Sequence, residues 1–196
     1  MILVRHNRLQ EPYNSYESLS MAELDDIATG KVSPPIEEVI SLDFVCSEII
    51  EGLKGAEKVL CSESIRTQLT CRAIMSLLDI DIPTETDSRL NEIIFVPSKI
   101  VPEGGGENPL SLVRSSLYEH MLKGGSHADS KFEIEKRIQS LFDDCRGKSI
   151  VCFTHGFLMR LIEAYEGSGE SIDIALKNIS EYQPVDYLQS MSFDRP

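Results

Sequence analysis

The sequence predicts an α/β fold, namely a three-layer α/β/α sandwich with a mostly parallel central sheet. Two observations lead to this prediction. Short apolar runs recur along the chain, and most are followed by a longer segment whose apolar residues have helical spacing. Strands that alternate with helices in this way are typical of parallel sheets, because each crossover connection places a helix on one face of the sheet.

The predicted strands are short and apolar, as expected for strands buried on both faces. Three are clear, at residues 2–4, 59–61 and 149–154, and a later one is expected within residues 187–193. The run at 149–154 is the strongest of them, because it is the longest and is followed at once by a helical pattern.

The predicted helices fall between these strands. Ser33 followed by two prolines predicts the start of a helix that ends near Gly55, since serine favours the N-cap and proline the first turn. Ser130 and Glu133 match a capping-box pattern. Residues 93–108, rich in proline and glycine, predict a loop. The expected helices are residues 20–28, 33–55, 64–78, 110–122, 130–145 and 157–165.

The composition is that of a soluble globular protein, and we expect one domain over residues 1–196. A net charge of −13 argues against nucleic acids or anionic membranes as partners. Five cysteines without a CxxC pair favour a reducing compartment over a disulfide framework or a zinc site. Because there is no apolar run of membrane-spanning length and no signal-peptide pattern, we expect a cytoplasmic location.

Polar side chains follow each of the three clear strands. Arg5 and His6 follow the first, Arg66 comes shortly after the second, and His155 follows the third. Each one alone would more commonly be a surface residue. The carboxyl ends of parallel strands meet at one edge of a sheet, however, so these side chains should converge there. Arginine matches phosphate oxygens, and histidine can act as a nucleophile or an acid–base group, so the pattern predicts a phosphate site.

Four motifs, taken in chain order, resemble those of the histidine phosphatase superfamily, which includes the cofactor-dependent phosphoglycerate mutases. Each motif alone is weak evidence, but the ordered set is specific. A weaker similarity lies in Gly124-Gly125-Ser126, followed by Arg137. The resemblance spans about residues 2–162 and implies a phosphoglycerate mutase-like fold. The four motifs are Ile-Leu-Val-Arg-His at 2–6, Ser-x-x-x-Arg-x-x-x-Thr at 62–70, Arg-Leu-Asn-Glu at 89–92 and Phe-Thr-His-Gly at 153–156.

The resemblance also implies a role for each matched residue. His6 would attack phosphorus and become phosphorylated, while Arg5, Arg66 and His155 would hold the phosphate oxygens. Glu92 would protonate the leaving oxygen and then activate water. Phosphoryl transfer is mainly a matter of positioning and charge stabilisation, which arginines can supply. We therefore expect no metal and no other cofactor.

The chain departs from the family pattern directly after His6. Asn7 stands where the family has glycine, and asparagine is the residue that best tolerates left-handed backbone after glycine. Arg8 is expected to point to solvent, although it could instead bind a second anionic group. Asn14 resembles a phosphate-contacting asparagine of the family but lies two residues too far along. We expect an insertion around residues 9–31 and a lid around residues 93–130.

Only 63 positions separate Glu92 from His155, which is closer to the phosphatases of the family than to its mutases. We therefore expect a phosphatase for a small phosphorylated substrate. A mutase-type phosphotransferase and a weakly active phospho-ligand binding protein remain as alternatives, and the substrate and oligomeric state stay open.

Cys61 precedes Arg66 with four intervening residues rather than the five of cysteine-dependent phosphatases, so we expect a buried structural thiol. The two other histidines, His120 and His127, are expected at the surface.

Overall fold

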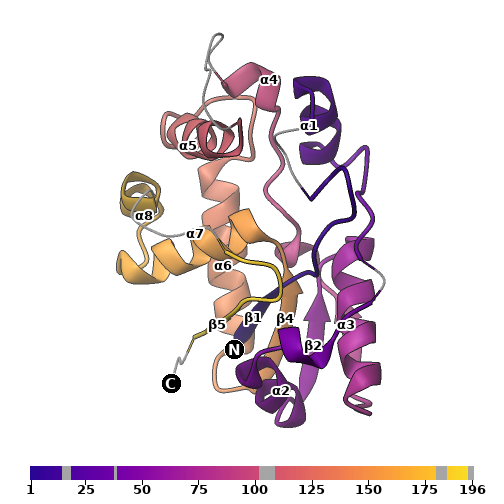
Figure 1. The fold of residues 1–196 in the computed structure, drawn as a ribbon. Helices are drawn as coiled ribbons and strands as arrows, with labels where there is room; N and C mark the ends of the chain where they lie inside the picture. The colour runs from indigo at the N-terminus through magenta and orange to yellow at the C-terminus, as the bar shows by residue number, and fades with distance from the viewer. Residues whose placement is uncertain (15–18, 38, 102–108, 180–184, 194–196) are drawn as a thin grey trace.

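The computed structural model describes the chain except residues 15–18, 38, 102–108, 180–184 and 194–196, and gives only the backbone of residues 109–111. Its centre is a five-stranded sheet of order β3-β2-β4-β1-β5 (Figure 1). Four strands are parallel, and β5 runs antiparallel to β1. The predicted α/β fold with a mostly parallel sheet is confirmed. The strands are β1 (Ile2–Arg5), β2 (Lys58–Cys61), β3 (Thr84–Thr86), β4 (Ile150–Thr154) and β5 (Ser190–Ser192).

Helices cover both faces of this sheet, because side chains along each central strand alternate between two cores. In β1, Leu3 packs into one core and Val4 into the other. The first core is shared with α5 (Pro109–Leu122), α6 (Lys131–Cys145), α7 (Gly156–Gly167) and α8 (Ile172–Asn178). The second core is shared with α2 (Ser47–Lys54) and α3 (Ile65–Leu77). Among the described residues, no helix has the length and apolar character needed to cross a membrane.

The predicted helix over residues 33–55 is wrong in its first half. The helix α2 begins only at Ser47, after a 3-10 turn η2 (Leu42–Phe44). Ile36 instead forms an antiparallel bridge with Leu9, and the Gln10 amide donates to the Pro35 carbonyl at 2.9 Å. Consecutive prolines favour extended backbone, since a residue that precedes proline avoids the helical region. The neighbouring segment after β1 then supplies the hydrogen bonds that a helix would have supplied.

Several short elements were not predicted. All three residues of β3 are exposed, so this edge strand has no apolar pattern to reveal it. Residues 93–108, predicted as a loop, contain the short helix α4 (Pro97–Ile100), and η3 (Ser88–Leu90) precedes it. The helix α8 was missed as well.

The capping box appears at a different helix from the one predicted. Ser130 is the N-cap of α6, but its side chain makes no capping hydrogen bond. Ser20 and Glu23 do form a reciprocal capping box at the start of α1 (Met21–Ala28), the helix expected at 20–28. Pairing of both backbone N–H groups with side-chain oxygens stabilises this short helix, which otherwise has few intrahelical bonds.

The helices α1 and α4 lie side by side beyond the carboxyl ends of the strands (Figure 1). The Asp25 carboxylate of α1 accepts hydrogen bonds from the Ser98 amide at 2.8 Å and the Ser98 hydroxyl at 2.5 Å. These contacts join the segment around 9–31 to the segment around 93–130. Both segments therefore stand over the edge of the sheet where ligands bind in α/β folds.

Candidate active site

His6 follows β1 directly and is 4% exposed. Its Nδ1 atom lies 2.7 Å from the backbone oxygen of Asn7. A carbonyl oxygen can only accept a hydrogen bond, so Nδ1 carries the proton and Nε2 keeps its lone pair. The backbone thus fixes His6 in the tautomer that has a nucleophilic Nε2.

His155 lies at the end of β4 and forms the N-cap of α7, with its ring centroid 5.3 Å from that of His6. Arg66, in the first turn of α3, donates from Nη2 to His155 Nδ1 at 3.3 Å. His155 Nε2 lies 2.8 Å from the hydroxyl of Ser62. Because arginine only donates, Nδ1 is the acceptor and Nε2 carries the proton, which it shares with Ser62. His155 is therefore neutral here and is held from both ring nitrogens.

Arg5 completes a group of two guanidinium groups and two imidazoles. Its guanidinium carbon lies 4.1 Å from the centre of the Tyr187 ring, and Nη1 donates to the Val185 carbonyl. A side chain at Gly156 would place a Cβ 3.1 Å from Arg5 Nε, so glycine leaves room for the arginine. Tyr187 also lies 5.8 Å from His6, between ring centroids. The sequence indicates Tyr187 only as part of the late strand, because no motif surrounds it, so its contact with Arg5 was not predicted.

The electrostatics of this group suit an anion. Burial, then Arg66 and Arg5, hold the pKa of His6 well below its usual value. Burial is also the largest cause of the lowered pKa of His155. The next causes are repulsion from His6 when that ring is protonated, and then from the guanidinium groups of Arg66 and Arg5. Both imidazoles are therefore neutral near pH 7, while the two guanidinium groups stay charged. The resulting positive potential favours a phosphate dianion.

Glu92 lies after η3, and its carboxylate accepts hydrogen bonds at the N-terminus of α7. Its oxygens lie 3.2 Å from the Phe157 amide, 2.9 Å from the Leu158 amide and 3.2 Å from the Ile93 amide. Burial raises the pKa of Glu92 above its ordinary value, although these backbone donors oppose the shift. Glu92 therefore keeps its proton to a higher pH than an exposed glutamate, as a general acid requires.

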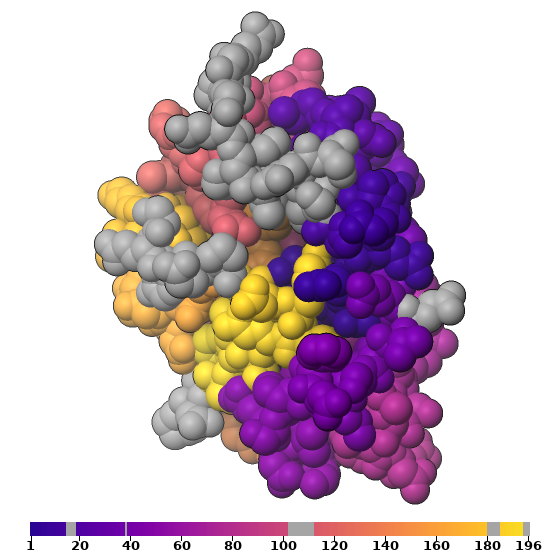
Figure 2. All heavy atoms as spheres, viewed as in Figure 1, coloured from indigo at the N-terminus to yellow at the C-terminus, as the bar shows by residue number. Residues whose placement is uncertain are grey.

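These side chains line one cleft of about 630 Å³ at the carboxyl edge of the sheet. The structure brings together all five residues that the motifs predicted as the core of the site, namely Arg5, His6, Arg66, Glu92 and His155. The C-terminal segment packs beside the site as well, since the Arg5 amide donates a hydrogen bond to the Gln189 carbonyl at 3.0 Å. Figure 2 shows the C-terminal residues (yellow) lying against N-terminal residues (indigo) on this face of the molecule.

Of the residues at the departures from the family pattern, Asn7 differs from the expectation and Arg8 agrees with it. Asn7 does not adopt left-handed backbone; its amide donates to the Thr70 hydroxyl at 2.9 Å and its side chain to the Glu37 carbonyl at 3.0 Å. The asparagine side chain therefore joins the end of β1 to the segment at Glu37, while the bond to Thr70 needs only the backbone amide. Arg8 is exposed, as expected. Asn14 lines the cleft, but its side-chain nitrogen donates to Glu11 at 2.5 Å.

The remaining residues of interest lie outside the cleft. His127 is exposed as predicted, whereas His120 is half-buried and its Nε2 accepts from the His127 amide at 3.2 Å. Cys61 is fully buried, as expected for a structural thiol. Arg137 lies behind the site, 4.0 Å from Asp129, and its charge contributes to the lowered pKa of His155.

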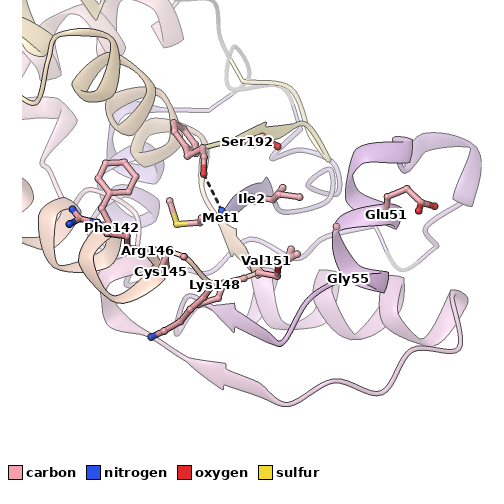
Figure 3. A pocket seen from close by; sticks show the side chains of 15 residues that line it. Met1, Ile2, Glu51, Gly55, Phe142, Cys145, Arg146, Lys148, Val151 and Ser192 are labelled. Carbon is pink, nitrogen blue, oxygen red and sulfur yellow. Dashed lines mark hydrogen bonds between the residues drawn. The ribbon is translucent and has the colours of Figure 1, made fainter. Parts of the chain in front are cut away.

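A second depression, of about 590 Å³, lies at the opposite, amino edge of the strands (Figure 3). The Met1 amino group donates there to the Phe193 carbonyl at 3.1 Å. The cations on its wall are engaged locally, with Lys148 bonded to the Asp144 carbonyl and Arg146 to Asp143. No histidine is among the described residues that line this depression, so we place the candidate site at the carboxyl edge. Across the part of the chain that the structure describes, no cluster of three or more metal-binding side chains occurs.

Comparison with known proteins identifies the fold. No protein-family model matches the chain, and no curated protein sequence does. Among solved structures, mycobacterial glucosyl-3-phosphoglycerate phosphatase matches with a TM-score of 0.64 at 12% identity, over 97% of this chain and 87% of that chain. The same phosphatase with VO3 matches with a TM-score of 0.63 at 13% identity, over 97% and 88%. Phosphoserine phosphatase from Entamoeba histolytica matches with a TM-score of 0.52 at 16% identity, over 96% and 87%.

Proposed function

We propose that this chain, which has the histidine phosphatase fold, hydrolyses phosphomonoesters through a phosphohistidine intermediate on His6. One observation carries the proposal: the nucleophilic Nε2 of His6 lies in the same buried pocket as Arg5, Arg66 and His155. The phosphatases that share the fold support it. We further propose that the reaction is independent of metal ions, because the two arginines can balance the phosphate charge.

In the first step, the phosphate group binds between the arginines and His6 Nε2 attacks phosphorus. A bond forms from Nε2 to phosphorus while the bond from phosphorus to the leaving oxygen breaks. Glu92, whose pKa is raised by burial, gives its proton to that oxygen. Charge spreads over the three equatorial oxygens at this point, where the guanidinium groups of Arg5 and Arg66 stabilise it.

In the second step, the Glu92 carboxylate takes a proton from water as the water oxygen attacks the phosphohistidine. The bond from phosphorus to His6 breaks, phosphate is released, and Glu92 is protonated again. A bound phosphate also raises the pKa of His155, because it adds negative charge beside the ring. His155 can then protonate at Nδ1 and donate to a phosphate oxygen, in place of the contact with Arg66.

We also propose that the whole chain forms one cytoplasmic domain in which residues around 9–31 are an insertion and residues around 93–130 a lid. The hydrogen bonds from Ser98 to Asp25 support a shared function for these segments, since they join the two over the strand ends. Both segments contribute side chains to the cleft, among them Leu24 and Phe95.

Hydrolysis of p-nitrophenyl phosphate with and without EDTA tests this function directly. We expect turnover that EDTA leaves unchanged and that vanadate, a phosphate analogue, blocks. Phosphate binding without turnover of any phosphomonoester would instead identify a binding protein. Conversion of 3-phosphoglycerate to 2-phosphoglycerate would identify a mutase.

The dependence of activity on pH should be bell-shaped, with an alkaline limb set by Glu92 and an acidic limb set by His6. Activity falls at high pH because Glu92 must be protonated and loses its proton above its raised pKa. It falls at low pH because His6 must be neutral and becomes protonated below its lowered pKa. The measurement is kcat/KM from pH 4 to 9, corrected for ionisation of the substrate.

The Glu92→Gln variant should lose the alkaline limb of this profile. We expect kcat on an alkyl phosphate to fall about 10²–10⁴-fold, with a smaller loss on p-nitrophenyl phosphate, whose leaving group needs little protonation. Glu119→Gln, on the exposed surface of α5, is the matched control and should behave as the wild type. An unchanged alkaline limb in Glu92→Gln contradicts the assignment of Glu92 as the acid.

A further inference from the structure

The cleft extends beyond the phosphate pocket, and its mouth is lined by large apolar side chains that are open to solvent. Ile65 is 47% exposed, Ile94 52% and Val32 38%. They come from three separate segments, at the start of α3, after η3 and after α1. Apolar side chains that gather from separate segments around one cavity mark a surface for an apolar ligand group.

The deeper wall of the cleft is apolar as well. The rings of Phe95 and Phe157 meet edge to face, with centroids 5.5 Å apart, and both line the cleft. Leu24 from α1 and Val113 from α5 lie on the same cavity. The two segments that stand over the strand ends therefore present mainly hydrocarbon to a bound molecule, beside the polar side chains of Asn14 and Arg114.

Several polar side chains that line the cleft already make hydrogen bonds. Asn91 donates to the Glu63 carboxylate at 2.7 Å and accepts from the Glu63 amide at 2.8 Å. Asn14 is bonded to Glu11, and Arg160 to Glu163. A sugar hydroxyl or a second carboxylate that used these groups would have to compete with the hydrogen bonds they already make.

We infer that the substrate is a phosphomonoester whose organic group is bulky and apolar, either an aryl or an extended alkyl group, rather than a sugar phosphate or a phosphoglycerate. This inference rests on the proposed function, because the phosphate is placed at His6. Its organic group would then lie against Ile65, Ile94 and Phe157. Each methylene group buried there should improve binding by up to about fourfold, which corresponds to about 0.8 kcal/mol.

A chain-length series tests the inference. Dissociation constants are measured by calorimetry for n-alkylphosphonates from methyl to octyl, which bind but are not hydrolysed. Values of kcat/KM are measured for the corresponding n-alkyl phosphates, whose longer members have similar leaving groups, and for glucose 6-phosphate and 3-phosphoglycerate. We expect affinity and kcat/KM to rise at least twofold per added carbon over several carbons, and the two polar substrates to be poorer than hexyl phosphate.

Variants locate the contact on the wall of the cleft. Ile65→Ser and Ile94→Ser should each lower the gain per carbon, because both side chains are exposed at the mouth. Leu77→Ser is the matched control, since Leu77 is 46% exposed at the far end of α3 and does not line the cleft. It should keep the gain per carbon of the wild type.

The two measurements separate this inference from the proposed function. Hydrolysis of all substrates with no dependence on chain length overturns the inference and leaves the phosphatase assignment standing. Phosphonate affinity that rises with chain length, without turnover of any phosphate, supports the apolar ligand class and overturns the phosphatase. Better hydrolysis of glucose 6-phosphate than of hexyl phosphate also overturns the inference.

Discussion

Replacing His6 with alanine is expected to reduce kcat on p-nitrophenyl phosphate at least about 10⁴-fold, because the covalent step loses the imidazole that attacks phosphorus. His155, the neighbouring imidazole, is held by Arg66 at one nitrogen and by Ser62 at the other. Affinity for inorganic phosphate should persist, since Arg5 and Arg66 remain. The measurements are steady-state kinetics and calorimetric binding of phosphate.

His127→Ala is the matched control for this variant, since His127 is exposed and does not line the cleft. It should retain full activity. If His6→Ala kept activity within tenfold of the wild type while folding normally, His6 would not be the nucleophile.

Replacing Arg66 with alanine should lower kcat/KM about 10²–10³-fold, as is typical when one preorganised donor to a developing charge is removed. Arg66 acts twice in this site: it supplies charge to the phosphate and it holds Nδ1 of His155 at 3.3 Å. Lysine should restore only part of the loss, because an ammonium group lacks the planar pair of donors. Steady-state kinetics on p-nitrophenyl phosphate measures both effects.

Arg72→Ala provides the comparison for a charge on the same helix. Arg72 is exposed, and its Nε donates to the Gln68 carbonyl one turn earlier in α3. We expect kcat/KM within twofold of the wild type. Equal losses in the two variants would mean that the effect comes from net charge or helix stability and not from the site.

The parts of the fold that could be predicted are those with a strong local signal. The strands β1, β2 and β4 are buried on both faces, so each is a continuous apolar run in the sequence. Residues that follow such runs necessarily gather at the carboxyl edge of a parallel sheet. For this reason the order of residues along the chain is enough to assign Arg5, His6 and His155 to one site.

The parts that could not be predicted depend on contacts between distant segments. The course of residues 35–37 is set by pairing with the segment after His6, such as the bond from the Glu37 amide to the Arg8 carbonyl at 2.9 Å. Tyr187 enters the site only because β5 pairs with β1 and returns the chain to Arg5. The conformational preference of a single residue does not predict such pairings. The preference of asparagine for left-handed backbone suggested a tight turn at Asn7, whereas in the structure Asn7 donates hydrogen bonds to Thr70 and Glu37.

Trapping of the phosphorylated enzyme tests the central claim most directly. The protein is mixed with ³²P-labelled phosphomonoester, quenched in alkali within milliseconds, and digested for mass spectrometry. We expect a labelled peptide that carries phosphate on His6, stable in alkali and labile in acid, and absent from His6→Ala. Phosphate on a different residue, or turnover with no labelled protein at any time, would contradict a phosphohistidine on His6.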